Sequence, residues 1–336
     1  MQQLQTNPCH HQQLILYTVH CQLFIGCLTL TCTISWRLSS AIKSSTLDPV
    51  PMFLLHEFVN VLLPDAICMV NSSLPQGRLP DSQKHAVISR HPASEAARTW
   101  HRGHGELQAN VKRDVHVEDR WVCCAVSRQL HQYLADNDLL PCYQSAYRRH
   151  HSIETAMLRV LSDVLMAADA QQVTMLCLLD LSAAFDCIDH QLLLQRLWRD
   201  FGFTETVLAW TTSFVTSRTQ QVLYKGCLSA VQPVQYGVPQ GSVHGPILFV
   251  LYTAEIGRIV AQHGLKFHQY ADDCQIYVPT SVSAVHSVID QLSCCLHDVN
   301  VWMSARWQCL NATKTQMLWL GSRHNINRLI VHEVPG

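Results

Sequence analysis

Short apolar runs separated by polar turns dominate the second half of the chain and predict its main elements. Residues 173–179 are almost continuously apolar and short enough for a buried strand. The runs 265–269 and 274–278 flank the tetrapeptide YADD at residues 270–273, which predicts a β-hairpin with two carboxylates at its tip. Residues 247–252 are all apolar and predict a helix that packs beneath this hairpin.

The adjacent carboxylates are Asp272 and Asp273, and two ionised aspartates side by side repel each other. The pair is favourable mainly when a hard divalent cation such as Mg²⁺ lies between them, together with substrate phosphates. A solvated turn is the alternative for an isolated pair. A third aspartate, Asp180, ends the predicted strand 173–179 and would complete a two-metal site for phosphoryl transfer. Its alternative role is the N-cap of a helix that starts near Ser182.

Four motifs follow one another in the order known from a single enzyme family. They are LDLSAAFDCIDH at 179–190, YGVPQGSVHGPILF at 236–249, YADD at 270–273 and LNATKT at 310–315. The segment LLPCYQSAYRRHHS at 139–152 precedes them. Together they closely resemble the reverse transcriptases of non-LTR (LINE-type) retrotransposons, which makes this chain similar to a partial and degenerate copy of such a domain.

The resemblance implies RNA-directed DNA polymerase activity, with two Mg²⁺ ions held by Asp180, Asp272 and Asp273. The backbone carbonyl of Leu181 is implied as a further ligand. One ion would lower the pKa of a primer 3′-hydroxyl, and the other would bind the triphosphate and stabilise the leaving pyrophosphate. The implied partners are an RNA template, a DNA primer and dNTP, and no protein partner is inferred.

Further substrate-binding residues follow from the same resemblance. Phe185 matches the aromatic gate that excludes a 2′-hydroxyl, although a core aromatic is the alternative. Gln240 and Gly241 lie in a glycine-proline turn that is placed over the incoming nucleotide and template in the family. Lys314 matches a lysine next to the triphosphate, and a solvated surface lysine is its alternative. His244 departs from the family, which has an apolar residue there, and its desolvation is expected to weaken the loop.

The implied fold is α/β (α+β), a right-hand polymerase palm with imperfect fingers. The palm is expected at 171–323, with a small antiparallel sheet that carries the aspartates and has helices on one face. The fingers-like region is expected at 46–170, and within it residues 89–124 do not match the family. A reading-frame shift, later restored, would produce such a segment. The tail 324–336 ends soon after the fourth motif, so the thumb is expected to be absent.

Composition alone does not indicate this function. Hydrophobic residues make up 48% of the 336 residues and charged residues 15%, with a net charge of −1. A nucleic-acid enzyme is usually basic, so any electrostatic footprint must be local, as at residues 148–151. The 15 cysteines form no CxxC pair and are expected to be reduced thiols of an intracellular protein, in the cytoplasm or nucleus.

Residues 1–45 have no counterpart in the family and carry an apolar stretch at 14–30. Its length would just allow a membrane span or an uncleaved signal, but its polar content and the lack of a preceding positive charge argue against insertion. Two functions from different classes therefore stay open. One is nucleotidyl transfer by a reverse transcriptase-like domain, and the other is a catalytically inactive transposon remnant that at most binds RNA.

Overall fold

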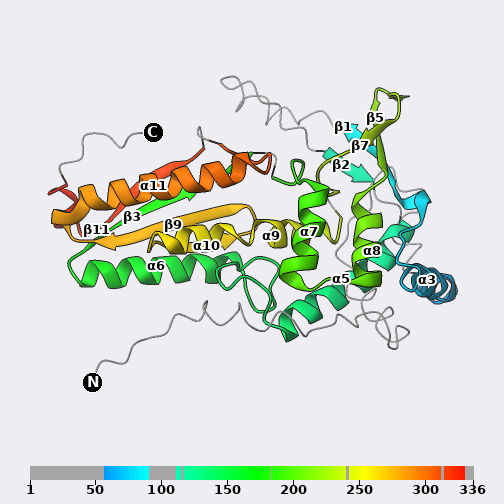
Figure 1. Ribbon diagram of the computed structural model, residues 1–336, viewed down its shortest axis with the longest axis horizontal. Helices are drawn as coiled ribbons and strands as arrows, with labels where there is room; N and C mark the ends of the chain where they lie inside the picture. Colours follow the sequence, from blue (N-terminus) through cyan, green and yellow to red (C-terminus); the bar gives the residue numbers. More distant parts are fainter. Residues whose placement is uncertain are drawn as a thin grey trace. The chain divides into compact units, whose positions relative to one another are not determined.

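The protein is described here by a computed structural model that covers residues 57–90, 111–114, 117–182, 184–239, 242–311 and 314–329. These residues form two compact units of helices and sheets, so the chain is a mixed α/β protein (Figure 1). The described part of the first unit lies within residues 139–193 and 246–329, and that of the second within 57–138 and 194–245. Residues 1–45 and the segment 91–110 lie outside the described residues. No helix of the described part is long and apolar enough to cross a membrane.

A four-stranded antiparallel sheet is the centre of the first unit. Its order is β11 (Gln316–Gly321), β3 (Val173–Leu179), β9 (Asp273–Thr280) and β8 (Lys266–Tyr270). Strand β3 confirms the strand predicted from the apolar run, and all its residues except Leu178 are buried. The carboxylate hairpin is also present, because β8 and β9 are joined by a tight turn.

Helices cover both faces of this sheet, not one face as expected (Figure 1). On one face α6 (Ile153–Asp169) packs Val160 and Val164 against Leu176 and Tyr277. Successive side chains of a strand point to opposite faces, so Cys177 belongs to the other face. There α11 (Val285–Ser304) brings the buried Cys295 near Cys177. The nearly continuous apolar pattern of β3 is explained by this burial on both faces.

Short elements complete the first unit around the sheet. The predicted helix is α9 (Gly245–Thr253), in which residues 247–252 are at most 2% exposed. The others are β4 (Leu181–Ser182), α10 (Ile256–Gln262), β10 (Cys309–Leu310) and α12 (Arg323–Ile326). Helix α7 (His190–Phe201) begins in this unit and continues into the second. A single turn of 3-10 helix, η3 (Val282–Ala284), precedes α11.

The second unit contains a mixed five-stranded sheet and three whole helices among its described residues, together with most of α7. The sheet order is β2-β1-β5-β6, β7 also pairs with β5, and only the β1–β5 pair is parallel. Its strands are β1 (His85–Arg90), β2 (Val111–Asp114), β5 (Arg218–Tyr224), β6 (Cys227–Leu228) and β7 (Gln232–Val234). Its helices are α3 (Val59–Ser73), α5 (Val117–Asp136) and α8 (Glu205–Val215), with the 3-10 turn η2 (Asp81–Gln83).

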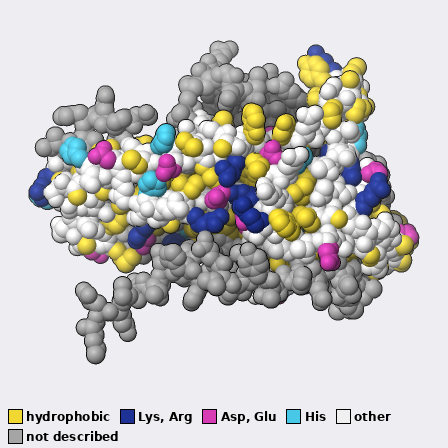
Figure 2. All heavy atoms as spheres, in the orientation of Figure 1, with side chains coloured by type: hydrophobic (Ala, Val, Ile, Leu, Met, Phe, Trp, Pro, Cys, Tyr) yellow, Lys and Arg dark blue, Asp and Glu magenta, His cyan; other side chains and the backbone are white. Residues whose placement is uncertain are grey.

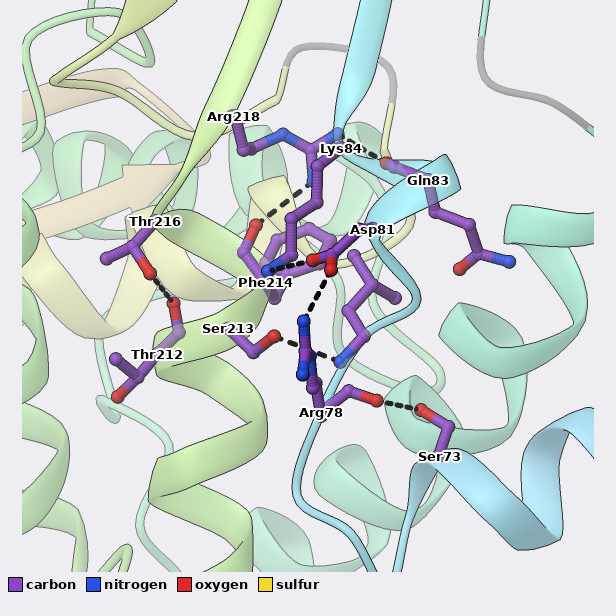
Figure 3. A network of polar contacts seen from close by, with 11 residues as sticks. Ser73, Arg78, Asp81, Gln83, Lys84, Thr212, Ser213, Phe214, Thr216 and Arg218 are labelled. Carbon is purple, nitrogen blue, oxygen red and sulfur yellow. Dashed lines mark hydrogen bonds and ion pairs between the residues drawn. The ribbon is translucent and has the colours of Figure 1, made fainter.

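Polar contacts link the segments that lead into the parallel strands β1 and β5 of this unit (Figure 3). The Arg218 guanidinium donates to the carbonyl of Phe214 at 3.0 Å, in the last turn of α8, and to the carbonyl of Gln83 at 3.2 Å, just before β1. The Lys84 ammonium lies 3.2 Å from the Asp81 carboxylate in the same connection. The two Arg218 contacts satisfy backbone carbonyls and join the end of α8 to the connection that precedes β1.

Candidate active site

The carboxylate turn is built by two residues. Tyr270 pairs with Asp273 at the end of the β8–β9 ladder, which leaves Ala271 and Asp272 as the turn itself. Ala271 has a φ of 56°, in the left-handed region. Asp272 and Asp273 therefore stand next to each other where the ladder ends, as the hairpin prediction requires.

Asp180 lies at the same end of the sheet as this turn, just after the last residue of β3. Its neighbour Leu179 pairs with Cys274, so the register of β3 on β9 brings Asp180 toward Asp273. Partial burial first, and then the charges of Asp272 and Asp180, raise the pKa of Asp273 above its ordinary value. The charges of Asp272 and Asp180 are therefore close enough to Asp273 to disfavour its charged form. The structure thus brings together three residues that are up to 93 positions apart in the chain (180 to 273).

The segment of the fourth motif also reaches Asp180. Strand β10 pairs with β4, and the Asn311 N–H donates to the Asp180 carbonyl at 2.9 Å. Lys314 Nζ then lies 3.6 Å from Asp180 Oδ2, with its side chain 50% exposed. Lys314 is therefore exposed and also paired, and its charge offsets part of the repulsion among the aspartates.

The helix expected after Asp180 does not begin near Ser182. Residues 181–182 form β4, residues 184–187 form a turn, and α7 begins only at His190. Asp189 caps that helix, because its Oδ1 accepts from the Leu192 N–H at 2.9 Å. Asp180 is thus not an N-cap, since pairing of β4 with β10 takes the backbone that the helix would have used.

Phe185 follows β4 and is half-buried. Its ring lies 4.8 Å from the Phe249 ring, centroid to centroid, at an angle of 31°. One side of Phe185 therefore packs against α9. Gln240 and Gly241 lie outside the described residues.

The donor atoms at this edge suit a hard cation. Burial first, then the charges of Asp272 and Asp273, raise the pKa of the Cys274 thiol, so it stays protonated and the carboxylates are the charged donors. Oxygen donors of this kind fit Mg²⁺ rather than a thiolate-seeking metal. No group of three His, Cys, Asp or Glu side chains in the described ranges is already placed to hold a metal ion.

A model of the reverse transcriptase (RNA-dependent DNA polymerase) family matches residues 115–331, well over half of the chain. The chain belongs to the reverse transcriptase family. The matched range contains all the aspartates of the site, Lys314 and both strands of the hairpin.

The relatives confirm the resemblance to non-LTR retrotransposon reverse transcriptases. The chain is 29% identical over 191 residues to the RNA-directed DNA polymerase from mobile element jockey of Drosophila funebris, which is 53% of this chain and 20% of that protein. It is 25% identical over 206 residues to the probable RNA-directed DNA polymerase from transposon X-element of Drosophila melanogaster, 59% of this chain and 22% of the relative. A putative 115 kDa protein in the retrotransposable element R1DM of Drosophila melanogaster is 28% identical over 179 residues, 53% of this chain and 17% of the relative. The chain thus spans about a fifth of the length of these relatives.

Two residues beside this candidate site, Gln144 and Tyr147, were not predicted from the sequence to take part in it. Burial first, and then the charge of Asp272, raise the pKa of the Tyr147 phenol, which lies near the carboxylate turn. The Gln144 amide contacts Ala271 within the turn. Both residues lie in the motif 139–152, but no local pattern shows that this segment runs beside β8.

His244 is accommodated in an aromatic pocket of the second unit. It is 1% exposed, and its ring lies edge-on to Trp210 and Phe214 at centroid distances of 5.2 and 5.3 Å. Burial first, and then the nearby His131, lower its pKa to about 3. Its Nε2 has no hydrogen-bond partner among the described residues. The neutral ring therefore acts mainly as a packing group, with an uncompensated polar atom.

This burial predicts a loss of stability in acid that His244→Leu should reduce. Below about pH 6.5 the unfolded chain binds a proton at His244 that the native state does not bind until about pH 3, so stability falls by about 1.4 kcal/mol per pH unit. Between pH 6.5 and pH 5.0 the native chain should lose about 2 kcal/mol more than His244→Leu. Denaturant unfolding at the two pH values measures this, and equal losses would contradict it. His268, whose pKa burial lowers to about 4, is present in both proteins and cancels.

Proposed function

We propose that this chain carries the palm and part of the fingers of an RNA-directed DNA polymerase that adds dNTP to a primer 3′-hydroxyl. The observation that supports it most is the meeting of Asp180, Asp272 and Asp273 at one sheet edge, within the range matched by the family. The sheet β11-β3-β9-β8 with α6 and α11 is the proposed palm.

The aspartates are the proposed ligands of two Mg²⁺ ions, with the backbone carbonyl of Leu181 as a further ligand. Bound Mg²⁺ supplies charge that lowers the pKa of the primer hydroxyl and stabilises the leaving pyrophosphate. Cys274 beside them stays a neutral thiol, so the proposed donors at this site are oxygen atoms.

Lys314 is the proposed contact to the triphosphate. Its ammonium already faces a charged oxygen of Asp180 and is half exposed, so it can exchange one anionic partner for another as a nucleotide binds. Gln240 and Gly241 are proposed to lie against the incoming nucleotide and the template. On the face drawn in Figure 2, Lys and Arg side chains form small groups beside Asp and Glu side chains, in keeping with a net charge of −1. Template binding is therefore expected to be weak and sensitive to salt.

Phe185 is the proposed sugar gate, held by its contact with Phe249. Phe185→Val should open space beside the 2′ position and raise the use of ribonucleotides relative to deoxyribonucleotides by about 10- to 100-fold. The measurement is the ratio of kcat/KM for the two nucleotides in primer extension. Phe185→Tyr, which keeps the ring, is the control and should leave the ratio near that of the native chain. An unchanged ratio in Phe185→Val would make Phe185 a packing residue only.

The proposed function is tested by primer extension on an RNA template with Mg²⁺ and the purified chain. Addition of deoxynucleotides that depends on the RNA template supports it. The alternative function, an RNA-binding remnant, predicts RNA binding in a filter or polarisation assay without any extension. RNA binding is therefore measured with the same preparation.

A further inference from the structure

The carboxylate turn contains a strained residue. Ala271 has a φ of 56° at the first position of a two-residue hairpin turn, where glycine is preferred because it has no Cβ. For an alanine this conformation costs about 1–2 kcal/mol unless surrounding contacts hold it. Asp272 and Asp273 follow directly, so the direction of the Ala271 peptide sets the direction of both carboxylates.

One buried side chain holds both polar groups of this residue. Gln144 is 1% exposed, and its Oε1 accepts from the Ala271 N–H at 3.0 Å. Its Nε2 donates to the Ala271 carbonyl at 3.2 Å. The same Oε1 also accepts from the Ala146 N–H at 2.9 Å, which fixes the amide group on its own segment.

Gln144 is itself held in place by backbone contacts. On either side of it, the Ser145 N–H donates to the Gln269 carbonyl and the Gln269 N–H donates to the Tyr143 carbonyl, both at 2.9 Å. The segment thus lies along β8 in parallel, with a bridge at Gln144 and Gln269. Arg148 Nη1 donates to the Gln144 carbonyl at 3.3 Å. The amide therefore reaches the turn from a rigid support.

We propose that Gln144 is a positioning residue that orients Asp272 and Asp273 toward Asp180 by clamping the Ala271 peptide. It acts through the backbone of the turn and does not touch substrate. Among side chains of this length, only an amide can accept from two N–H groups and donate to a carbonyl at once. This inference rests on the proposed metal site, so its test includes a variant that examines that site alone.

The test uses Tb³⁺, a hard cation whose luminescence is excited through nearby tyrosines, as a probe of the carboxylates in the full chain. Gln144→Leu should weaken Tb³⁺ binding by about 10- to 100-fold, the usual effect of losing a group that orients metal ligands. Gln132→Leu, which changes an exposed glutamine on α5, is the matched control and should bind as the native chain does. Gln144→Asn keeps the amide but is too short to reach both groups of Ala271, and it serves if the leucine variant does not fold.

Adding Ala271→Gly separates positioning from a general loss of folding. Glycine adopts a φ of 56° without strain, so the double variant Gln144→Leu with Ala271→Gly should recover much of the lost Tb³⁺ affinity. If folded Gln144→Leu and Gln144→Asn bind Tb³⁺ as the native chain does, and Asp272→Asn abolishes binding, the clamp is overturned and the metal site is kept. Unchanged binding by Asp272→Asn would overturn the metal site and the clamp together.

Discussion

Asp272→Asn is expected to reduce Mg²⁺-dependent primer extension by at least about 1000-fold, equivalent to about 4 kcal/mol of lost transition-state stabilisation. The substitution keeps the size of the side chain and removes one charge from a cluster proposed to hold two divalent ions. Asp180→Asn should have an effect of the same size. The free energy of unfolding of Asp272→Asn should not fall, because the charge of Asp272 raises the pKa of Asp273 and its removal relieves that repulsion in the native state.

The measurement is single-turnover extension on an RNA template, together with thermal unfolding of each variant. Asp290→Asn is the control, because Asp290 is exposed on α11, away from the hairpin in sequence. It should extend within about twofold of the native chain, as surface changes usually do. Extension by Asp272→Asn or Asp180→Asn at the native rate would remove that residue from the proposed active site.

Elements with a strong local pattern were predicted correctly from the sequence. The strand 173–179 and the helix of residues 247–252 each follow from a nearly continuous apolar run with polar ends, and the hairpin around Ala271 follows from two short strand-like runs that flank a polar pair. The apolar pattern of residues 173–179 also indicates that helices cover both faces of the sheet, where one covered face was expected. A strand that is apolar at nearly every position is buried on both faces, and α6 and α11 provide that burial.

Features that depend on distant pairing were not predictable in this way. The helix expected near Ser182 is replaced by β4 because Cys309 and Leu310 pair with that segment from more than 120 positions away. Gln144 reaches Ala271 across 127 positions, and nothing in its neighbourhood marks it as part of a site. The three aspartates were grouped from their places at the ends of predicted strands, and the order of the four motifs, matched to a known family, supported that grouping.

Tyr143, next to Gln144 in the chain, packs against Gly257 of α10 so closely that adding one methyl group at Gly257 should have a large effect. A Cβ on Gly257 would lie 2.6 Å from Tyr143 Cε2 and closer still to Cζ and Cε1. The ring cannot easily retreat, because its hydroxyl donates to the Ala254 carbonyl and its edge packs on Phe267 at 5.0 Å. Gly257→Ala should therefore lower the free energy of unfolding by about 3 kcal/mol, the upper range for overpacking a core.

The sign of this change makes it diagnostic. Gly→Ala in an open helix stabilises by about 1 kcal/mol, so a loss would show that the Tyr143 ring decides the outcome. Denaturant unfolding measures it, with Arg258→Ala, an exposed change on the same helix, expected within about 0.5 kcal/mol of the native chain. Combining Gly257→Ala with Tyr143→Leu removes the ring and should recover part of the loss as a coupling between the two sites. Additive effects would mean that Tyr143 does not fill the space above Gly257. Because Tyr143 precedes Gln144, Gly257→Ala should also weaken Tb³⁺ binding, by moving the support of the carboxylate turn.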